Sequence, residues 1–301
     1  MDLFDVGCRP GILLGSSARW HEEVIATSRI RLSMMLHSIR AIAATRYDVR
    51  MRIVRLFWAG VEIESGGATL VIDLLEHTAP IRSLMGDPRL PIVFGSELLD
   101  FALVTHLHPD HYDPDALRRK LRPDAKVFCD PVNARKIARD GFTVIGATLY
   151  EPISVGPFTV TALPAVDGLG DPQVSFLVEF ENIKLMHFGD TLWHGHWWKI
   201  RARCGPPDVA FLPINGAITQ FPNMKPSGIP ADLMPDQAAS AAAILEARVA
   251  CPIHYGAFHN PPVYSELPDV ERMFLEAADR LGIVSQIIDP GNEIAISRDR
   301  P

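Results

Sequence analysis

Several features that define other classes of protein are scarce or absent in this 301-residue chain. Its four cysteines are widely scattered and form no CxxC pair, which argues against a disulfide scaffold and for a reduced, cytoplasmic protein. No apolar run approaches the roughly 18 to 20 residues that a membrane-spanning helix needs. The acidic first residues also lack the basic-then-apolar order of a secretory signal. We therefore expect no membrane segment and no export signal.

Positive charge is in deficit as well. The chain has 29 Lys and Arg against 36 Asp and Glu, a formal net charge of −7. Binding to nucleic acid or to an anionic membrane surface needs a basic face, so we expect neither partner. The expected partner is a small-molecule substrate, and self-association into a homo-oligomer is left open.

A dense group of metal-binding side chains stands out against this background. The seven residues from position 105 read Thr-His-Leu-His-Pro-Asp-His and follow an apolar run that predicts a buried strand. Alternate side chains of an extended chain point the same way, so His106 and His108 can grip one ion together. The proline that follows ends the strand and turns the chain, which lets Asp110 and His111 reach a second ion. A His-rich polar loop is the alternative, but imidazole and carboxylate together are typical metal ligands.

The rest of the chain divides into two parts. Residues 1–50 are expected to form an N-terminal extension, helical or poorly ordered, with a short amphipathic helix around 29–40. Residues 51–301 carry the ordered pattern: strands paired as a hairpin about Gly66-Gly67, then strands that alternate with helices. This order predicts two packed sheets with helices outside them.

Three later strand ends carry possible ligands: Asp167, Asp190 and His254. Each has an ordinary explanation when taken alone. Asp-Gly is a common turn, and a lone histidine can be a satisfied core residue. Like the first cluster, each of them comes at the end of a predicted strand.

Together these segments resemble the metallo-β-lactamase superfamily, and within it the branch of the phosphorylated-ascorbate lactonases. The resemblance covers residues 52–298 and rests on His106-x-His108-x-Asp110-His111, Phe188-Gly189-Asp190-Thr191, Phe211-Leu212-Pro213-Ile214 and Pro252-Ile253-His254-Tyr255-Gly256. It implies an α/β fold, a four-layer αββα sandwich with metals held at one edge by loops that leave the strands.

The resemblance also implies a ligand set for two divalent ions, zinc first, with manganese or iron as alternatives. His106 and His108 would hold the first metal, Asp110, His111 and His254 the second, and Asp190 would bridge both. The family's remaining histidine ligand corresponds here to Asp167. In addition, the segment Trp58-Ala59-Gly60-Val61 stands where relatives often have a Gly-His pair. Asp167 would make the centre more neutral and favour oxygen-preferring metals modestly. Alternatively Asp167 faces away and the first site is short of a ligand.

The expected chemistry is hydrolysis of an ester, lactone, amide or phosphodiester by a water molecule whose pKa bound metals lower toward about 7. Asp110 or Asp190 could accept the transferred proton, and His194 or His196 could protonate the leaving group. The alternative for these two histidines is packing among neighbouring tryptophans.

Other residues are expected to support the site. Asp73 could orient a ligand histidine, and loops 77–97 and 215–234 could form the pocket walls.

Three rival functions remain at this point. A nuclease would need a basic groove or a clamp domain, and the acidic balance of the chain argues against it. A diiron redox enzyme would usually have a carboxylate in place of His108 and a flavin-binding partner domain, neither of which the sequence indicates. A metal-binding but catalytically silent sensor or interaction protein of the same fold stays open as the alternative.

Overall fold

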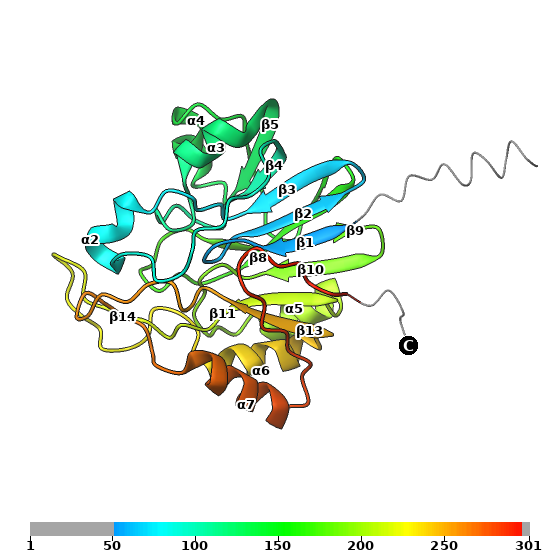
Figure 1. The fold of residues 1–301 in the computed structure, drawn as a ribbon. Coiled ribbons are helices and arrows are strands. Elements are labelled where there is room, and N and C mark those ends of the chain that lie inside the picture. The colour runs from blue at the N-terminus through cyan, green and yellow to red at the C-terminus, as the bar shows by residue number, and fades with distance from the viewer. Residues whose placement is uncertain (1–50, 297–301) are drawn as a thin grey trace, which may run out of the picture. The chain divides into compact units, whose positions relative to one another are not determined.

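The computed structural model describes residues 51–296, so the predicted extension over residues 1–50 lies outside the described residues. Two six-stranded sheets form the described part, and both are mixed (Figure 1). The first has the order β1 (Arg52–Arg55), β2 (Val61–Ser65), β3 (Ala68–Ile72), β4 (Leu99–Leu103), β5 (Leu121–Cys129), β6 (Val144–Gly146). The second has the order β13 (Val249–Ile253), β11 (Val209–Pro213), β10 (Ile183–His187), β9 (Val174–Phe180), β8 (Phe158–Pro164), β7 (Pro152–Val155).

Helices cover the outer face of each sheet (Figure 1). The first sheet carries α3 (Pro114–Lys120) and α4 (Ala134–Arg139), and the second carries α5 (Trp197–Cys204), α6 (Pro235–Leu245) and α7 (Val270–Arg280). Short elements extend from one edge of the sandwich: η1 (Ala79–Ile81), α2 (Arg82–Met85) and the strand pair β12 (Ile218–Thr219) and β14 (Tyr264–Ser265). The predicted αββα sandwich is confirmed.

Alternation along the strands produces these layers. In β3, Leu70 and Ile72 join the core between the sheets, whereas Val71 joins the cluster under α3 and α4. In β11, Phe211 faces the core between the sheets and Leu212 packs toward the helices. Because successive side chains of a strand point to opposite faces, strands covered on both sides are apolar at every position.

Strand direction decides where the functional side chains meet. β3, β4, β5 and β6 run parallel to one another, and so do β10, β11 and β13. β8 runs in the same direction as β10, since both are antiparallel to β9. The residues that follow β3, β4, β8, β10 and β13 carry the predicted ligands and Asp73, and they therefore collect at the carboxyl ends of these strands.

Most predicted elements agree with the structure, and the differences have local causes. The hairpin is confirmed, with both turn glycines at positive φ. The strand predicted at 126–128 is longer, because Leu121 pairs with Leu99 before the exposed charged residues that hide the pattern. The last predicted strand is reduced to a single bridge between Glu293 and Val54. Within residues 51–296, none of the helices has both the length and the apolar character to cross a membrane.

Candidate metal centre

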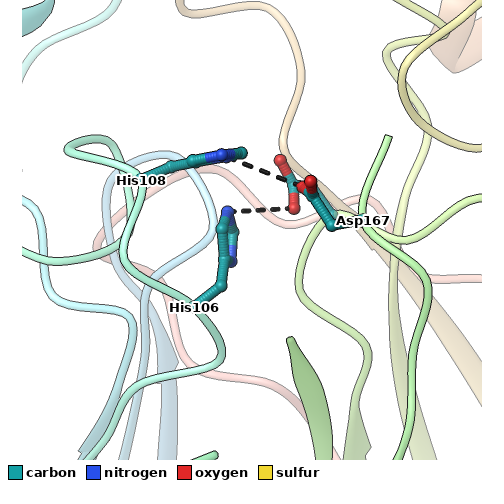
Figure 2. A group of neighbouring side chains, drawn as sticks. His106, His108 and Asp167 are labelled. Carbon is teal, nitrogen blue, oxygen red and sulfur yellow. Dashed lines mark ion pairs between the residues drawn. The ribbon is translucent and has the colours of Figure 1, made fainter. Parts of the chain in front are cut away.

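The first group of candidate ligands joins the loop after β4 to loops of the second sheet. His106, His108, Asp167 and Asp190 can each offer a ligand atom within 4.8 Å of the others. Figure 2 shows His106 and His108 rising from one loop toward Asp167 on the opposite one. Nε2 of His106 lies 3.2 Å from Oδ1 of Asp190, and Nδ1 of His108 lies 3.7 Å from Oδ1 of Asp167.

The second group lies deeper and consists of Asp110, His111 and His254. The Nε2 atoms of the two histidines are 2.9 Å apart, and Oδ2 of Asp110 lies 3.6 Å from Nε2 of His111 and 3.4 Å from Nε2 of His254. Ligand atoms about 2.0–2.1 Å from a tetrahedral ion are about 3.3 Å apart. The three side chains therefore converge at the spacing that one metal ion requires.

Asp190 stands between the two groups. Its Oδ1 faces His106, whereas its Oδ2 lies 3.7 Å from Nε2 of His111 and 3.9 Å from Nε2 of His254. Gly189 makes this placement possible: its φ is +62°, and an added Cβ would lie 3.0 Å from the Thr105 hydroxyl. The tight turn after β10 thus aims the two oxygens of one carboxylate at different groups of neighbours.

Asp73 holds the loop that carries the histidines. Its carboxylate accepts hydrogen bonds from the backbone N–H of Thr105 (2.8 Å) and from its hydroxyl (2.7 Å), and Oδ2 lies 2.8 Å from Nδ1 of His111. The bond to Nδ1 directs Nε2 of His111 toward the other ligands. The predicted contact between Asp73 and a ligand histidine is therefore present.

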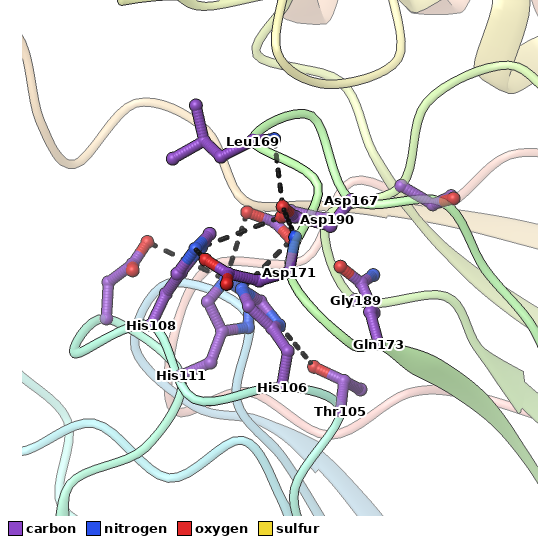
Figure 3. Close-up of polar contacts among 12 residues, drawn as sticks. Thr105, His106, His108, His111, Asp167, Leu169, Asp171, Gln173, Gly189 and Asp190 are labelled. Carbon is purple, nitrogen blue, oxygen red and sulfur yellow. Dashed lines mark hydrogen bonds and ion pairs between the residues drawn. The ribbon is translucent and has the colours of Figure 1, made fainter. Parts of the chain in front are cut away.

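Asp167 faces the cluster and not the solvent. Its Oδ2 accepts hydrogen bonds from the backbone N–H groups of Leu169 and Asp171, both at 2.8 Å, which leaves Oδ1 toward His108 (Figure 3). Gly168 allows the close approach of two loops here, because a Cβ at this position would lie 2.1 Å from the Ala231 carbonyl oxygen. The alternative that Asp167 points away from the site does not match the structure.

The charges of the site are strongly coupled. Burial, followed by the carboxylates of Asp232 and Asp110, raises the pKa of Asp190 well above its usual range. Burial and the neighbouring imidazoles lower the pKa of His106 well below its usual value. Burial alone would raise the pKa of Asp110, but the neighbouring imidazoles of His111, His254 and His108 together outweigh it, and the pKa is lowered well below its usual range. Several buried carboxylates repel one another here, and added positive charge would relieve this.

Unpaired polar atoms test whether the residues fit a metal. Nε2 of His106 and Oδ1 of Asp190 are buried and make no hydrogen bond, and neither does Oδ1 of Asp232. Buried polar atoms without a partner are costly in a native structure. Nε2 of His106 and Oδ1 of Asp190 also lie 3.2 Å apart, an arrangement of lone pairs that a divalent cation would satisfy, so the donor set fits a metal.

Two of the sequence expectations need comment. Trp58, in the segment where the family often has a Gly-His pair, donates its indole N–H to Oδ2 of Asp110 (3.0 Å) and packs against the ring of His254. His194 is not brought to the cluster: its ring stacks on Trp197 at 4.1 Å, and burial lowers its pKa to about 4. A proton-donating role for His194 finds no support in this position, whereas its packing among tryptophans does.

Sequence reasoning missed two buried residues beside His254. Asp232, 4% exposed, places Oδ2 3.6 Å from Nδ1 of His254 and forms a third possible ligand group with Asp190 and His254. Asn215 lies 2.9 Å from the same Nδ1 and donates a hydrogen bond to the Tyr264 hydroxyl. Asn215 follows β11, so its strand-end position could have identified it. Asp232 stands alone in a long loop with no comparable signal.

Removal of the Asp232 charge is expected to weaken metal binding. The Asp232→Asn variant keeps the shape but loses a negative charge beside His254, and we expect metal affinity to fall by roughly 10- to 100-fold. Competition with a chromophoric chelator measures this. Asp236→Asn, an exposed matched change at the start of α6, is the control, and equal affinity of Asp232→Asn and wild type would remove Asp232 from the site.

A cavity of about 200 Å³ opens onto these residues. Four aspartates and two histidines line it: Asp110, Asp167, Asp190, Asp232, His108 and His254. Residues of loops 77–97 and 215–234 also line it, including Ile81, Met85 and Phe221, so the prediction that these loops wall the pocket is confirmed.

The fold and this site together define a metal-dependent hydrolase of the metallo-β-lactamase fold. The model of the beta-lactamase superfamily domain matches residues 77–255, and the chain belongs to that superfamily.

Individual relatives agree with this assignment. A UPF0173 metal-dependent hydrolase of Thermococcus kodakarensis is 28% identical over 222 residues, which are 71% of this chain and 89% of the relative. Among solved structures, a metallo hydrolase of Ignicoccus hospitalis has a TM-score of 0.60 at 20% identity and covers 81% of this chain and 97% of its own. CmlA, a diiron β-hydroxylase of Streptomyces venezuelae, has a TM-score of 0.65 at 16% identity, and the match covers 82% of this chain and 54% of CmlA. The fold alone therefore does not decide the chemistry.

Proposed function

We propose that the protein hydrolyses an ester, lactone or related bond of a small molecule with water activated by two divalent ions. The observation that carries this proposal is the position of Asp190, whose two oxygens face two separate groups of ligand-competent side chains. Zinc is the first expectation, and the carboxylates Asp110, Asp167 and Asp190 keep manganese and iron as alternatives.

The residues of the chain have distinct roles in this proposal. His106, His108 and Asp167 would hold one ion, and Asp110, His111 and His254 the other. Ions bound there would supply a water nucleophile at neutral pH and charge to polarise the substrate oxygen. Asp110 and Asp190 border the cavity and are the proposed acceptors of the proton that water gives up. Asp73 would accept the proton of Nδ1 of His111 and so leave Nε2 to face an ion.

Metal analysis combined with turnover tests the proposal. Metal-loaded wild type is expected to contain two equivalents and to cleave a 4-nitrophenyl ester, whereas His108→Ala should lose one equivalent and the activity. His77→Ala removes an exposed histidine outside both groups and serves as the matched control.

The two remaining functions predict different results. Two bound ions with no turnover of esters, lactones or phosphodiesters would favour the silent metal-binding protein. Iron that cycles between oxidation states with uptake of dioxygen would favour a redox enzyme.

A further inference from the structure

Candidate ligands and a set of apolar side chains, here called the apolar wall, line the same cavity. Side chains from η1, α2 and two loops form this wall: Ile81, Leu84, Met85, Leu169, Phe221 and Ala231. Ile81 and Met85 are nearly fully buried within the core between the sheets, and Leu84 and Phe221 pack against the same core. The wall is therefore part of the packed interior and not a loose surface patch.

Positive charge is missing from the same cavity. Among residues 51–296, no lysine or arginine lines it, whereas four aspartates do. Two divalent ions would bring four positive charges, and the carboxylates of Asp110, Asp167, Asp190 and Asp232 would balance them. An anion bound there would lose its hydration, and neither a basic side chain nor excess metal charge would compensate for this loss. Binding of an anion is therefore unfavourable.

The cation to consider is Lys225, which lies in an adjoining hollow. That hollow shares Gly168, Leu169 and Phe221 with the cavity, but Lys225 lines only the outer one. Residue 225 is exposed, so its ammonium group remains hydrated. Recognition of an anion at the cavity would have to depend on this side chain, which makes Lys225 the matched test position.

We propose, resting on the proposed hydrolase function, that the substrate is uncharged and presents an apolar acyl or alkyl group to this wall. A cavity of about 150 Å³ accepts a benzene ring, and the present one of about 200 Å³ accepts a small ring or a short chain. Phosphorylated lactones and phosphodiesters are disfavoured as substrates, which narrows the range that the sequence predicted.

A pair of esters that differ only in charge tests the proposal. 4-Nitrophenyl pentanoate and the 4-nitrophenyl monoester of glutaric acid have acyl groups of similar length, and only the second ends in a carboxylate. After correction for their hydroxide-catalysed rates, kcat/KM is expected to favour the neutral ester by at least about tenfold. From acetate to pentanoate, kcat/KM should rise by up to about fourfold per methylene, because each buries against the wall.

Two variants test whether the preference for the neutral ester originates at the cavity. Phe221→Lys adds a cation to the wall and is expected to reduce the preference for the neutral ester by about tenfold. Lys225→Ala is expected to leave the preference unchanged. Equal or better turnover of the anionic ester by wild type, lost in Lys225→Ala, would overturn the proposal.

Binding without turnover separates this proposal from the hydrolase function. Saturation-transfer NMR compares pentanamide with glutaramate, its anionic counterpart, on metal-loaded and on chelator-treated protein. Pentanamide is expected to bind both forms and glutaramate neither, and Phe221→Lys should weaken the binding of pentanamide. If pentanamide binds but no ester is cleaved, the hydrolase function fails while the substrate class stands. If glutaramate binds as well as pentanamide, or neither amide binds, the proposed substrate class is wrong.

Discussion

Asp190→Asn is expected to lose hydrolysis by roughly 10⁴-fold or more, the scale observed when a group that enables the reaction is removed. The amide fills the same space as the carboxylate but carries no charge, and only one of its two atoms can bind a cation. Oδ1 faces His106 and Oδ2 faces His111 and His254, so the substitution weakens both groups at once. Metal content should fall from two equivalents to one or fewer, measured by elemental analysis.

The matched control for this variant is Asp115→Asn, on the exposed side of α3. It makes the same chemical change far from both ligand groups, and wild-type metal content and activity are expected. His108→Ala should lose one ion, so the two variants differ in stoichiometry. Asp190→Asn protein that retains two ions and full turnover would contradict the bridging role.

Asp73→Ala is expected to lower the free energy of unfolding by about 3–5 kcal/mol, the cost of removing one partner of a buried polar network. Asp73 is 1% exposed, and its removal leaves the Thr105 N–H, the Thr105 hydroxyl and the His111 ring without their acceptor. Its φ of +50° adds to the cost, since alanine tolerates this conformation less well than aspartate. Urea unfolding of the metal-free protein measures the loss.

Asp73→Asn separates stability from metal binding. The amide oxygen can still accept from the Thr105 N–H, so most of the stability should remain. Its NH₂ group would face Nδ1 of His111 and favour the tautomer with the proton on Nε2, the atom that faces His254. Metal affinity should therefore fall by roughly 10- to 100-fold. Wild-type affinity in this variant would show that Asp73 only supports the fold.

The parts of the site that the sequence predicted are those set by local geometry. His106 and His108 alternate on an extended segment, and Asp190 follows a glycine that only a turn explains, so spacing alone brings them near a strand end. Asp167 and His254 were also identified at predicted strand ends, but their role as ligands came from family resemblance, since a strand end does not by itself specify which other strand ends it meets. The αββα layers came from resemblance together with the order of strands and helices.

The parts that the sequence did not predict depend on contacts across the chain. Asp232 lies beside His254 in a loop that touches the loop of Gly168, and neither loop has a periodic pattern. The first half of β5 is charged and exposed, and its strand conformation comes from pairing with β4. His194 was placed near the cavity by its distance in sequence from Asp190, but its ring turns toward Trp197 instead.

The candidate ligands come from both sheets: one loop leaves β4 of the first, and the others leave β8, β10 and β13 of the second. Ions bound there would crosslink the two sheets of the sandwich. Any opening that parts the sheets would have to release the ions, so the folded form gains the whole free energy of their binding, about 4 kcal/mol for free metal at a thousand times its dissociation constant. Loss of the metal would then abolish catalysis and would also lower the stability of the folded protein.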